Sequence, residues 1–166
     1  MAIFTSVPGR GLRELLMSWD AIKQANPDME LYITSDYTLW GVDANDHVFR
    51  KLALGRDDIH YLGAIPREEL VSLQLKASRM FYPCTYDELF CIAIAEAEVA
   101  GVHVVSTGMG ACATTNMCDV TTPEHFVGAC KEALAIPANH DTIRNNALAR
   151  FSPKVVLEQW DKLIFN

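Results

Sequence analysis

Apolar positions along the chain fall into two kinds of segment: short continuous runs typical of buried strands, and longer stretches with helical spacing. Residues 2–6 form the first run, and residues 10–26 then place apolar side chains three or four positions apart, with charged ones opposite. The predicted strands are residues 2–6, 29–34, 59–62, 80–82 and 102–106. The predicted helices are residues 10–26, 46–54, 66–78, 90–100, 123–135, 139–150 and 153–164.

This alternation predicts an α/β fold, a Rossmann-like parallel sheet with helices on both faces. The strands are too short and too apolar for a sheet with one solvent-facing side, whereas a parallel sheet buries both of its faces. No internal repeat, low-complexity tract or linker interrupts the pattern. We therefore expect residues 1–166 to form a single domain.

Composition narrows the function classes. The chain has 166 residues, half of them hydrophobic, which is enough for a core without disulfides or metals. Its net charge of −7 and its lack of a Lys/Arg run argue against a nucleic-acid groove or a basic membrane patch. No apolar run reaches the roughly 18 residues of a spanning helix, and no signal peptide is evident. We expect a cytoplasmic location. The mean hydropathy of +0.08 indicates an apolar face that meets another surface.

Cysteine and histidine spacing gives no support for a metal site or a disulfide framework. The five cysteines form no CxxC pair and are expected to be reduced and mostly buried. The five histidines lack the spacing of metal ligands, and His103, in an apolar strand, is expected to be a core residue. No DxD carboxylate pair is present either. We expect no metal.

The loop after the first strand carries a candidate anion site. Gly9, Arg10 and Gly11 lie where a strand leads into a helix, and free amides and the helix dipole favour an anion there. Arg10 would add a fork of donors to a phosphate. A tight turn with a solvated arginine is the alternative, since the loop matches neither GxGxxG nor a Walker A motif.

Two glutamates stand eight residues apart in the segment that leads into the most apolar helix. On one helix, Glu88 and Glu96 would lie about 12 Å apart, too far to share a proton but well placed to hold two ends of an extended ligand. Glu96 interrupts an apolar helix, so it must reach water, a cation or hydroxyl donors. The alternative is that it caps a sheet edge or pairs with a lysine. Glu98, on another side of the helix, is expected to be solvated.

Two further loops after strands contain glycines. Gly63 precedes Ala64, Ile65 and Pro66, and Gly110 lies within residues 107–111. Glycines let a backbone approach a ligand closely. Either loop could equally be an ordinary turn.

Several segments together resemble the C-terminal, donor-binding half of a GT-B glycosyltransferase of the family 4 type (group 1). They are TSVPGRGLRELLMSW, NPDMELYI, IHYLGAIPREEL, FYPCTYDELFCIAIAEAEVAGVHVVST and FSPKVVLEQWDKL. The most specific is the stretch from Glu88 to Ala100, which is similar to the family's EX7E motif. The resemblance implies retaining, metal-independent transfer of a hexosyl group from a UDP-sugar or GDP-sugar, with the diphosphate stabilised electrostatically.

The resemblance also implies roles for individual residues. Arg10 would contact the diphosphate, Glu88 the donor sugar and Glu96 the ribose hydroxyls. The backbone amides at Phe90, Cys91 and Ile92 would contact sugar or phosphate. Gly63 and Ile65 would lie by the base, and Gly9 and Gly110 would allow close backbone approach.

The chain departs from the family pattern in three ways. Residues 5–9 lack the second basic residue that many members carry, Cys91 replaces a common glycine, and Ala113 to Asn116 stand where many members have an acidic residue. The N-terminal acceptor domain of a GT-B enzyme is also absent from these 166 residues, so we expect the chain alone to be inactive. That domain, in cis or in trans, is the expected partner and could bring the protein to the cytoplasmic membrane face.

Two other interpretations remain open at this point. One is a non-catalytic nucleotide-binding or interaction module derived from the same fold. The other is a flavodoxin-like domain of different function, although the sequence shows no flavin-phosphate loop and no acidic cluster of a phospho-receiver.

Overall fold

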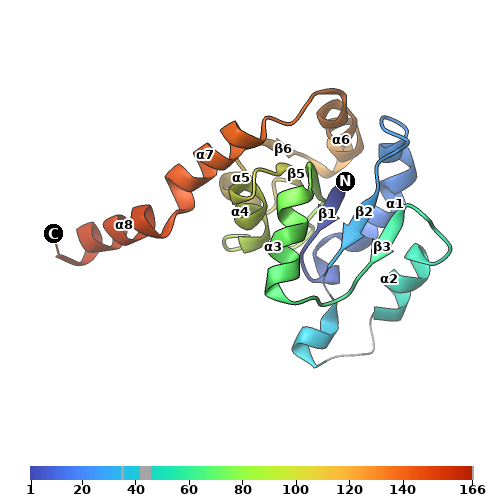
Figure 1. Ribbon diagram of the computed structural model, residues 1–166, viewed down its shortest axis with the longest axis horizontal. Coiled ribbons are helices and arrows are strands. Elements are labelled where there is room, and N and C mark those ends of the chain that lie inside the picture. The colour runs from blue at the N-terminus through green and yellow to red at the C-terminus, as the bar shows by residue number, and fades with distance from the viewer. Residues whose placement is uncertain (35, 42–45, 166) are drawn as a thin grey trace.

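The protein is an α/β domain built on one parallel sheet, seen here in a computed structural model that describes residues 1–34, 36–41 and 46–165 (Figure 1). Its strands are β1 (Ala2–Phe4), β2 (Leu31–Ile33), β3 (Ile59–Tyr61), β4 (Arg79–Tyr82), β5 (His103–Thr107) and β6 (Asp119–Thr121). Its α-helices are α1 (Leu12–Lys23), α2 (Asp46–Ala53), α3 (Arg67–Lys76), α4 (Ile92–Val99), α5 (Cys112–Thr115), α6 (Phe126–Ala135), α7 (His140–Phe151) and α8 (Pro153–Phe165). Short 3-10 turns cover Pro8–Arg10, Tyr37–Trp40 and Pro123–His125.

The strands lie in the order β3-β2-β1-β4-β5-β6, and every pairing is parallel. Ala2 of β1 pairs with Leu31 of β2 on one side and with Arg79 of β4 on the other. From β1 the chain first moves outward to β2 and β3, then returns to β4 and continues the other way. The order therefore reverses between β1 and β4, and ligands of such sheets bind beyond the strand ends at this point.

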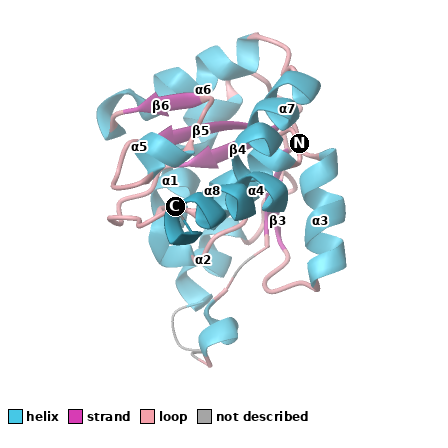
Figure 2. Cartoon of the chain, turned by 90° about the vertical axis from the view of Figure 1, so that its left-hand side faces the viewer, coloured by secondary structure: helices cyan, strands magenta, loops and turns pink. Residues whose placement is uncertain are grey.

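Helices cover both faces of the sheet, as the sequence pattern predicts. On one face α1 packs against α2 and α6, and on the other α4 packs against α5 and α7. Right-handed crossovers place α3 on the same face as α4, because both connections run in the same direction across the sheet. Figure 2 looks at the face on which α4 and α5 lie in front of β4 and β5.

The core lies between these layers and is nearly all apolar. One stripe of α1, made of Leu12, Leu15, Trp19 and Ile22, is buried against the sheet. The central strand β4 is buried along its whole length, because it has a strand on each side and a helix layer on each face. Arg79 is its one charged residue, and it donates to the carbonyl oxygens of Ala133, in the last turn of α6, and of Ile136, just after that helix.

The fold class and most element positions are confirmed, with three corrections. The sequence pattern missed β6 and α5, which are three and four residues long. The helix predicted from residue 90 begins at Ile92, because Cys91 has a left-handed backbone (φ 63°). Glu88 therefore lies in the loop before α4, and its separation from Glu96 is not that of two residues on one helix.

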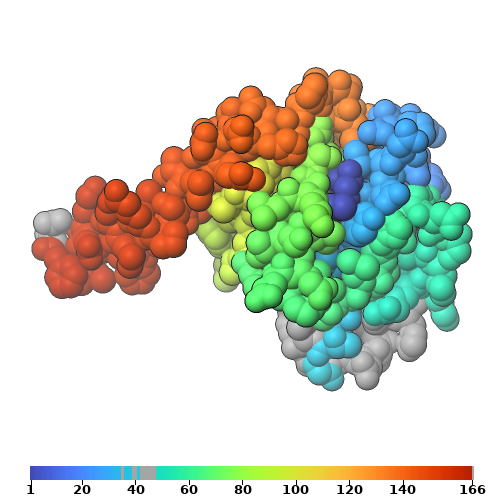
Figure 3. Space-filling model, viewed as in Figure 1, coloured from blue at the N-terminus to red at the C-terminus, as the bar shows by residue number. Residues whose placement is uncertain are grey.

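The C-terminal helix α8 extends away from the rest of the domain. In Figures 1 and 3 it forms an arm that continues from α7, and its direct contacts are mainly with α7. None of its residues is fully buried. Among the described residues, no helix is long and apolar enough to cross a membrane.

Candidate functional site

The loops that follow β1 and β4 meet at the reversal of strand order and form one side of a cavity of about 520 Å³. Arg10 comes from the turn after β1, Glu88 from the loop after β4, and Glu96 from the second turn of α4. All three line this cavity, together with Phe90, Cys91 and other residues around them. The cavity thus collects the charged residues that the sequence singles out.

Arg10 and Glu88 form an ion pair on this side of the cavity. Arg10 Nη1 donates to Glu88 Oε1, and the Arg10 guanidinium also lies over the ring of Tyr86, 4.5 Å from its centroid. The Glu88 side chain is 6% exposed and that of Arg10 is 28% exposed. Burial opposes the charge on Arg10, but the hydrogen bond and the charge of Glu88 outweigh it and raise the Arg10 pKa. The pair is charged and mostly shielded from water.

Tyr82, the last residue of β4, also contacts Glu88. Its hydroxyl lies 3.1 Å from Glu88 Oε1 and 3.1 Å from Ser6 Oγ, which comes from the loop after β1. Burial raises the pKa of the Tyr82 phenol well above its ordinary value. Tyr82 therefore stays protonated and can donate to the carboxylate.

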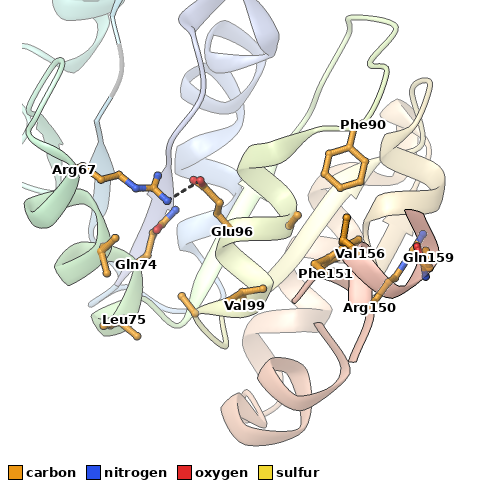
Figure 4. A pocket seen from close by; sticks show the side chains of 13 residues that line it. Arg67, Gln74, Leu75, Phe90, Glu96, Val99, Arg150, Phe151, Val156 and Gln159 are labelled. Atoms are coloured by element: carbon orange, nitrogen blue, oxygen red, sulfur yellow. Dashed lines mark ion pairs between the residues drawn. The ribbon is translucent and has the colours of Figure 1, made fainter. Parts of the chain in front are cut away.

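Glu96, in the middle of the apolar helix, pairs with a cation. This is one of the three kinds of partner expected for it from the sequence: water, a cation or hydroxyl donors. Its Oε1 lies 2.8 Å from Arg67 Nη2, at the start of α3 (Figure 4). Glu96 lines both the 520 Å³ cavity and a neighbouring cavity of about 740 Å³, and Arg67 lines the second of these. The structure thus gives Glu96 an arginine partner where the alternative interpretation had a lysine.

The start of α4 is open to an anion. Cys91 is the N-cap residue, and it makes no side-chain hydrogen bond that would satisfy the first amides of the helix. Such amides, together with the helix dipole, attract negative charge. The carbonyl oxygens of the preceding loop are tied to the rest of the protein, since Ala111 N donates to Glu88 O over 2.7 Å and Thr115 Oγ1 donates to Phe90 O.

Two glycines near the site allow neighbouring loops to lie close to each other. Gly11 has φ 105°, and a Cβ there would collide with the carbonyl of Pro83 in the loop after β4. Gly110 has φ 53°, and a Cβ there would lie 2.5 Å from Glu88 O. Both positions hold loops against the Glu88 segment, so they shape the site without lining it.

Three buried thiols cluster next to the cavity, and one of them, Cys91, lines it. Cys112 hydrogen-bonds to both Cys84 and Cys91, and this contact lowers the pKa of both of these thiols below the ordinary value. All five cysteines are free, and four of them are buried. The prediction of reduced, mostly buried thiols is confirmed. Among the described residues, no three His, Cys, Asp or Glu side chains form a group that could hold a metal ion.

The sequence matches the profile of the family described as "Glycosyl transferases group 1" over residues 3–135. The chain belongs to this family. No curated protein matches it. This group 1 assignment agrees with the resemblance given by the sequence segments, and the EX7E-like stretch and Arg10 both lie inside the matched range.

Solved glycosyltransferases share the fold of this group 1 chain. A glycosyltransferase from Rickettsia africae aligns with a TM-score of 0.75 at 15% identity, over 99% of this chain and 48% of its own. HepE from Anabaena, solved with UDP-glucose, aligns with a TM-score of 0.72 at 19% identity, over 98% of this chain and 47% of its own. WaaG, involved in lipopolysaccharide biosynthesis, gives 0.70 at 18% identity, over 99% of this chain and 47% of its own. The chain spans about half the length of these proteins.

The structure brings most of the predicted site residues together. Arg10, Glu88, Glu96, Phe90, Cys91 and Ile92 all line the 520 Å³ cavity. Gly9, Gly63, Ile65 and Gly110 are not among its lining residues. The loop of Gly63 is held instead by Asp36, whose Oδ2 accepts from Ala64 N at 3.1 Å.

Glu98 does not lie where the sequence pattern placed it. It was expected to be solvated, but it is fully buried: Oε1 accepts from Met117 N at 2.8 Å, and Oε2 has no hydrogen-bond partner. The reason is that α7 and α5 pack against α4 and cover the side of the helix that carries Glu98. Glu98 cannot serve as an exposed control for Glu96.

Sequence reasoning missed Ser6, Tyr82 and Tyr86 as site residues. The available signal for Tyr82 is its place at the carboxyl end of an apolar strand, where a buried phenol needs a hydrogen-bond partner. Tyr86 lies in a polar loop, and nothing in its spacing indicates that its ring would meet Arg10.

Proposed function

We propose that this chain is the donor-binding domain of a retaining, metal-independent glycosyltransferase that transfers a hexosyl group from a UDP-sugar or GDP-sugar. The observation that carries the proposal is the cavity at the reversal of strand order, with Arg10, Glu88 and Glu96 on its walls. Membership of the group 1 family and the likeness to HepE, which was solved with UDP-glucose and with UDP, support a nucleotide-sugar donor.

The diphosphate is assigned to Arg10 and the start of α4. Arg10 is the one basic side chain among the described residues that line the cavity, and a guanidinium can bind phosphate oxygens through two parallel hydrogen bonds. The amides near Cys91 and Ile92 add dipolar attraction. With these donors, no cation is needed to hold the diphosphate. Gly9 and Gly110 are assigned to shaping the loops beside it.

The sugar and the ribose are assigned to the two glutamates. Glu88 lies beside Arg10 and can accept hydrogen bonds from the hydroxyls of the donor sugar, while Glu96 lies further along α4 and can accept from the ribose. Glu96 uses Oε1 for Arg67, which leaves Oε2 for a ribose hydroxyl. The base is assigned to the loop of Gly63 and Ile65, at the end of β3.

Metal-free titration of nucleotides tests this assignment. We expect the protein to bind UDP or GDP, and the corresponding nucleotide sugars, by calorimetry in the presence of EDTA. Arg10→Ala should weaken binding of the diphosphate about tenfold or more, since a hydrogen bond to a charged group contributes about 1.5–3 kcal/mol. Arg13→Ala, on the exposed side of α1, is the matched control and should bind as the wild type does. Folded protein that binds none of these nucleotides contradicts the proposal.

We also propose that an acceptor-binding domain, in the same or another polypeptide, packs against α8. Large apolar side chains of α8 are exposed, among them Trp160 (60%), Leu163 (82%) and Phe165 (79%). An exposed patch of this kind marks a contact surface. The purified chain should then bind the nucleotide sugar but transfer no sugar to an acceptor. Glycosyl transfer by these 166 residues alone, measured by release of UDP or GDP, would contradict this part of the proposal.

A non-catalytic nucleotide-binding or interaction module is the second candidate. One observation favours it: Arg10 is already paired with Glu88, and no second basic side chain lines the described cavity. To bind a diphosphate, Arg10 would have to break its ion pair with Glu88. The same titration tests the interaction form of this candidate, because a module that has lost its donor site binds neither nucleotide. A non-catalytic module that still binds nucleotide would be recognised instead by the absence of transfer when an acceptor domain is supplied.

A further inference from the structure

Tyr82, which hydrogen-bonds to the Glu88 carboxylate, is held in place by the packing around its ring. Its side chain is fully buried on the central strand β4, and its ring packs against Phe4 of β1 with centroids 5.7 Å apart. The hydroxyl is the one polar group of this side chain, and it lies at hydrogen-bond distance from both Ser6 Oγ and Glu88 Oε1. Tyr82 is thus a rigid support placed directly beneath the carboxylate.

The directions of these two hydrogen bonds follow from proton counting. A phenol has one proton, and an ionised carboxylate can only accept. Tyr82 therefore donates to Glu88, and the Ser6 hydroxyl donates to the oxygen of Tyr82. The result is a chain of hydrogen bonds from Ser6 through Tyr82 to Glu88, which links the loops after β1 and β4.

Arg10 and Tyr82 contact the same oxygen of Glu88 but differ in freedom of movement. The Arg10 side chain is partly exposed, so it can turn toward a phosphate, whereas Tyr82 is enclosed by the core. When Arg10 turns away, Glu88 keeps the hydrogen bond from Tyr82. A carboxylate that lost both partners would be a buried, unpaired charge, which is strongly unfavourable.

We infer that Tyr82 is a positioning residue for donor recognition: it fixes the Glu88 carboxylate beside the donor sugar while Arg10 engages the diphosphate. The inference rests on the proposed function, because Glu88 and Arg10 have these separate tasks only if a nucleotide sugar binds. It assigns Tyr82 to the sugar part of the ligand. Removing its hydroxyl should therefore affect the nucleotide sugar and spare the nucleotide.

The test compares UDP with UDP-glucose, and GDP with GDP-mannose, by calorimetry on the wild type and on Tyr82→Phe. For the pair that the wild type binds, we expect Tyr82→Phe to bind the nucleotide sugar about tenfold more weakly and the free nucleotide within about twofold. Tyr32→Phe, on β2, is the matched control, since its hydroxyl contacts Glu30, just before that strand, at 2.9 Å. It should bind both ligands as the wild type does.

A double-mutant cycle separates positioning from a general structural effect. In a Glu88→Ala background, Tyr82→Phe should have no further effect on the affinity for the nucleotide sugar, because there is no carboxylate left to hold. Equal weakening of nucleotide and nucleotide sugar, or additive losses in the cycle, would overturn the inference while leaving the proposed function intact. Wild-type protein that binds neither pair would instead contradict the proposed function itself.

Discussion

Glu96, the acidic residue in the middle of the apolar helix α4, shares one of its two carboxylate oxygens with Arg67 of α3. The pair connects two helices that cover the same face of the sheet, and its acidic member, Glu96, lines the candidate donor site. Arg67 is largely exposed, so the pair itself contributes little to stability. Its consequence is orientation: one oxygen is held, and the other is directed away from Arg67.

Removing the Glu96 carboxylate should weaken nucleotide binding. We expect Glu96→Ala to lower the affinity for UDP or GDP about tenfold or more, through the loss of hydrogen bonds between a charged acceptor and the ribose. Calorimetry measures the change. Glu132→Ala, at an exposed position of α6, is the control in place of the buried Glu98. Equal affinities of the two variants would remove Glu96 from the ribose site.

The left-handed backbone at Cys91 gives a prediction about stability. A side chain with φ 63° carries a conformational cost of about 1–2 kcal/mol that glycine does not have. Both Cys91→Gly and Cys91→Ala remove the buried thiol, but only glycine relieves the backbone. We therefore expect the glycine variant to be more stable than the alanine variant by about 1 kcal/mol in denaturant unfolding. An alanine variant of equal or greater stability would mean that the backbone at residue 91 is not left-handed.

The buried Glu98 predicts a pH dependence of stability. Burial raises the Glu98 pKa above its ordinary value of 4.5, so the folded protein holds a proton that the unfolded chain releases. Its contribution is then fully present below about pH 4.5 and is lost as the pH rises through the folded pKa. The Glu98→Gln variant has no carboxyl group at this position, so its stability does not fall with pH for this reason. Relative to that variant, the wild type should become less stable as the pH rises, and a constant difference across the pH range would contradict the prediction.

Asp58 should make stability depend on pH in the opposite direction. Its carboxylate accepts hydrogen bonds from Arg56 (3.0 Å), Lys23 (2.9 Å) and Trp19 (2.9 Å), and these partners, Arg56 foremost, hold its pKa well below the ordinary 3.8. This stabilisation is present above about pH 3.8 and is lost as the pH falls through the lowered pKa.

Asp58→Asn should therefore lower the free energy of unfolding by about 2 kcal/mol at pH 7. The difference from the wild type should shrink as the pH falls below about 4, because Asp58 then takes up a proton in the unfolded chain while it is still ionised in the folded protein. Denaturant unfolding at pH 7 and at pH 3 measures both quantities. Asp28→Asn, at an exposed position before β2, is the control and should have little effect at either pH.

The sequence was sufficient for the first five strands of the sheet and for the region of the site. Long apolar segments such as residues 10–26 reveal their periodicity, and strand ends in a parallel sheet meet at one edge, so Arg10 and Glu88 could be expected to lie close together. The edge strand β6 could not be found this way. It has three residues, and its middle residue, Val120, is exposed, so no alternation of buried and exposed positions marks it.

The pattern of apolar and polar positions in the sequence could not predict specific side-chain contacts. Glu98 was expected in water because helical geometry alone gives the direction of a side chain and not what covers it. Its surroundings depend on α5 and α7, which follow it in the chain by more than ten residues. The Arg10–Glu88 pair and the hydrogen bonds of Tyr82 likewise depend on how two loops pack, which spacing along the chain does not encode.

The contact between Gly11 and Pro83 limits how this site could be redesigned. Because any side chain at residue 11 would strike the carbonyl of Pro83, the loops after β1 and β4 cannot be varied independently. A library that aims to change donor preference should keep Gly11 and Pro83 constant. Diversity is better placed at Val7, Leu89 and Ala93, which line the cavity and take no part in that contact.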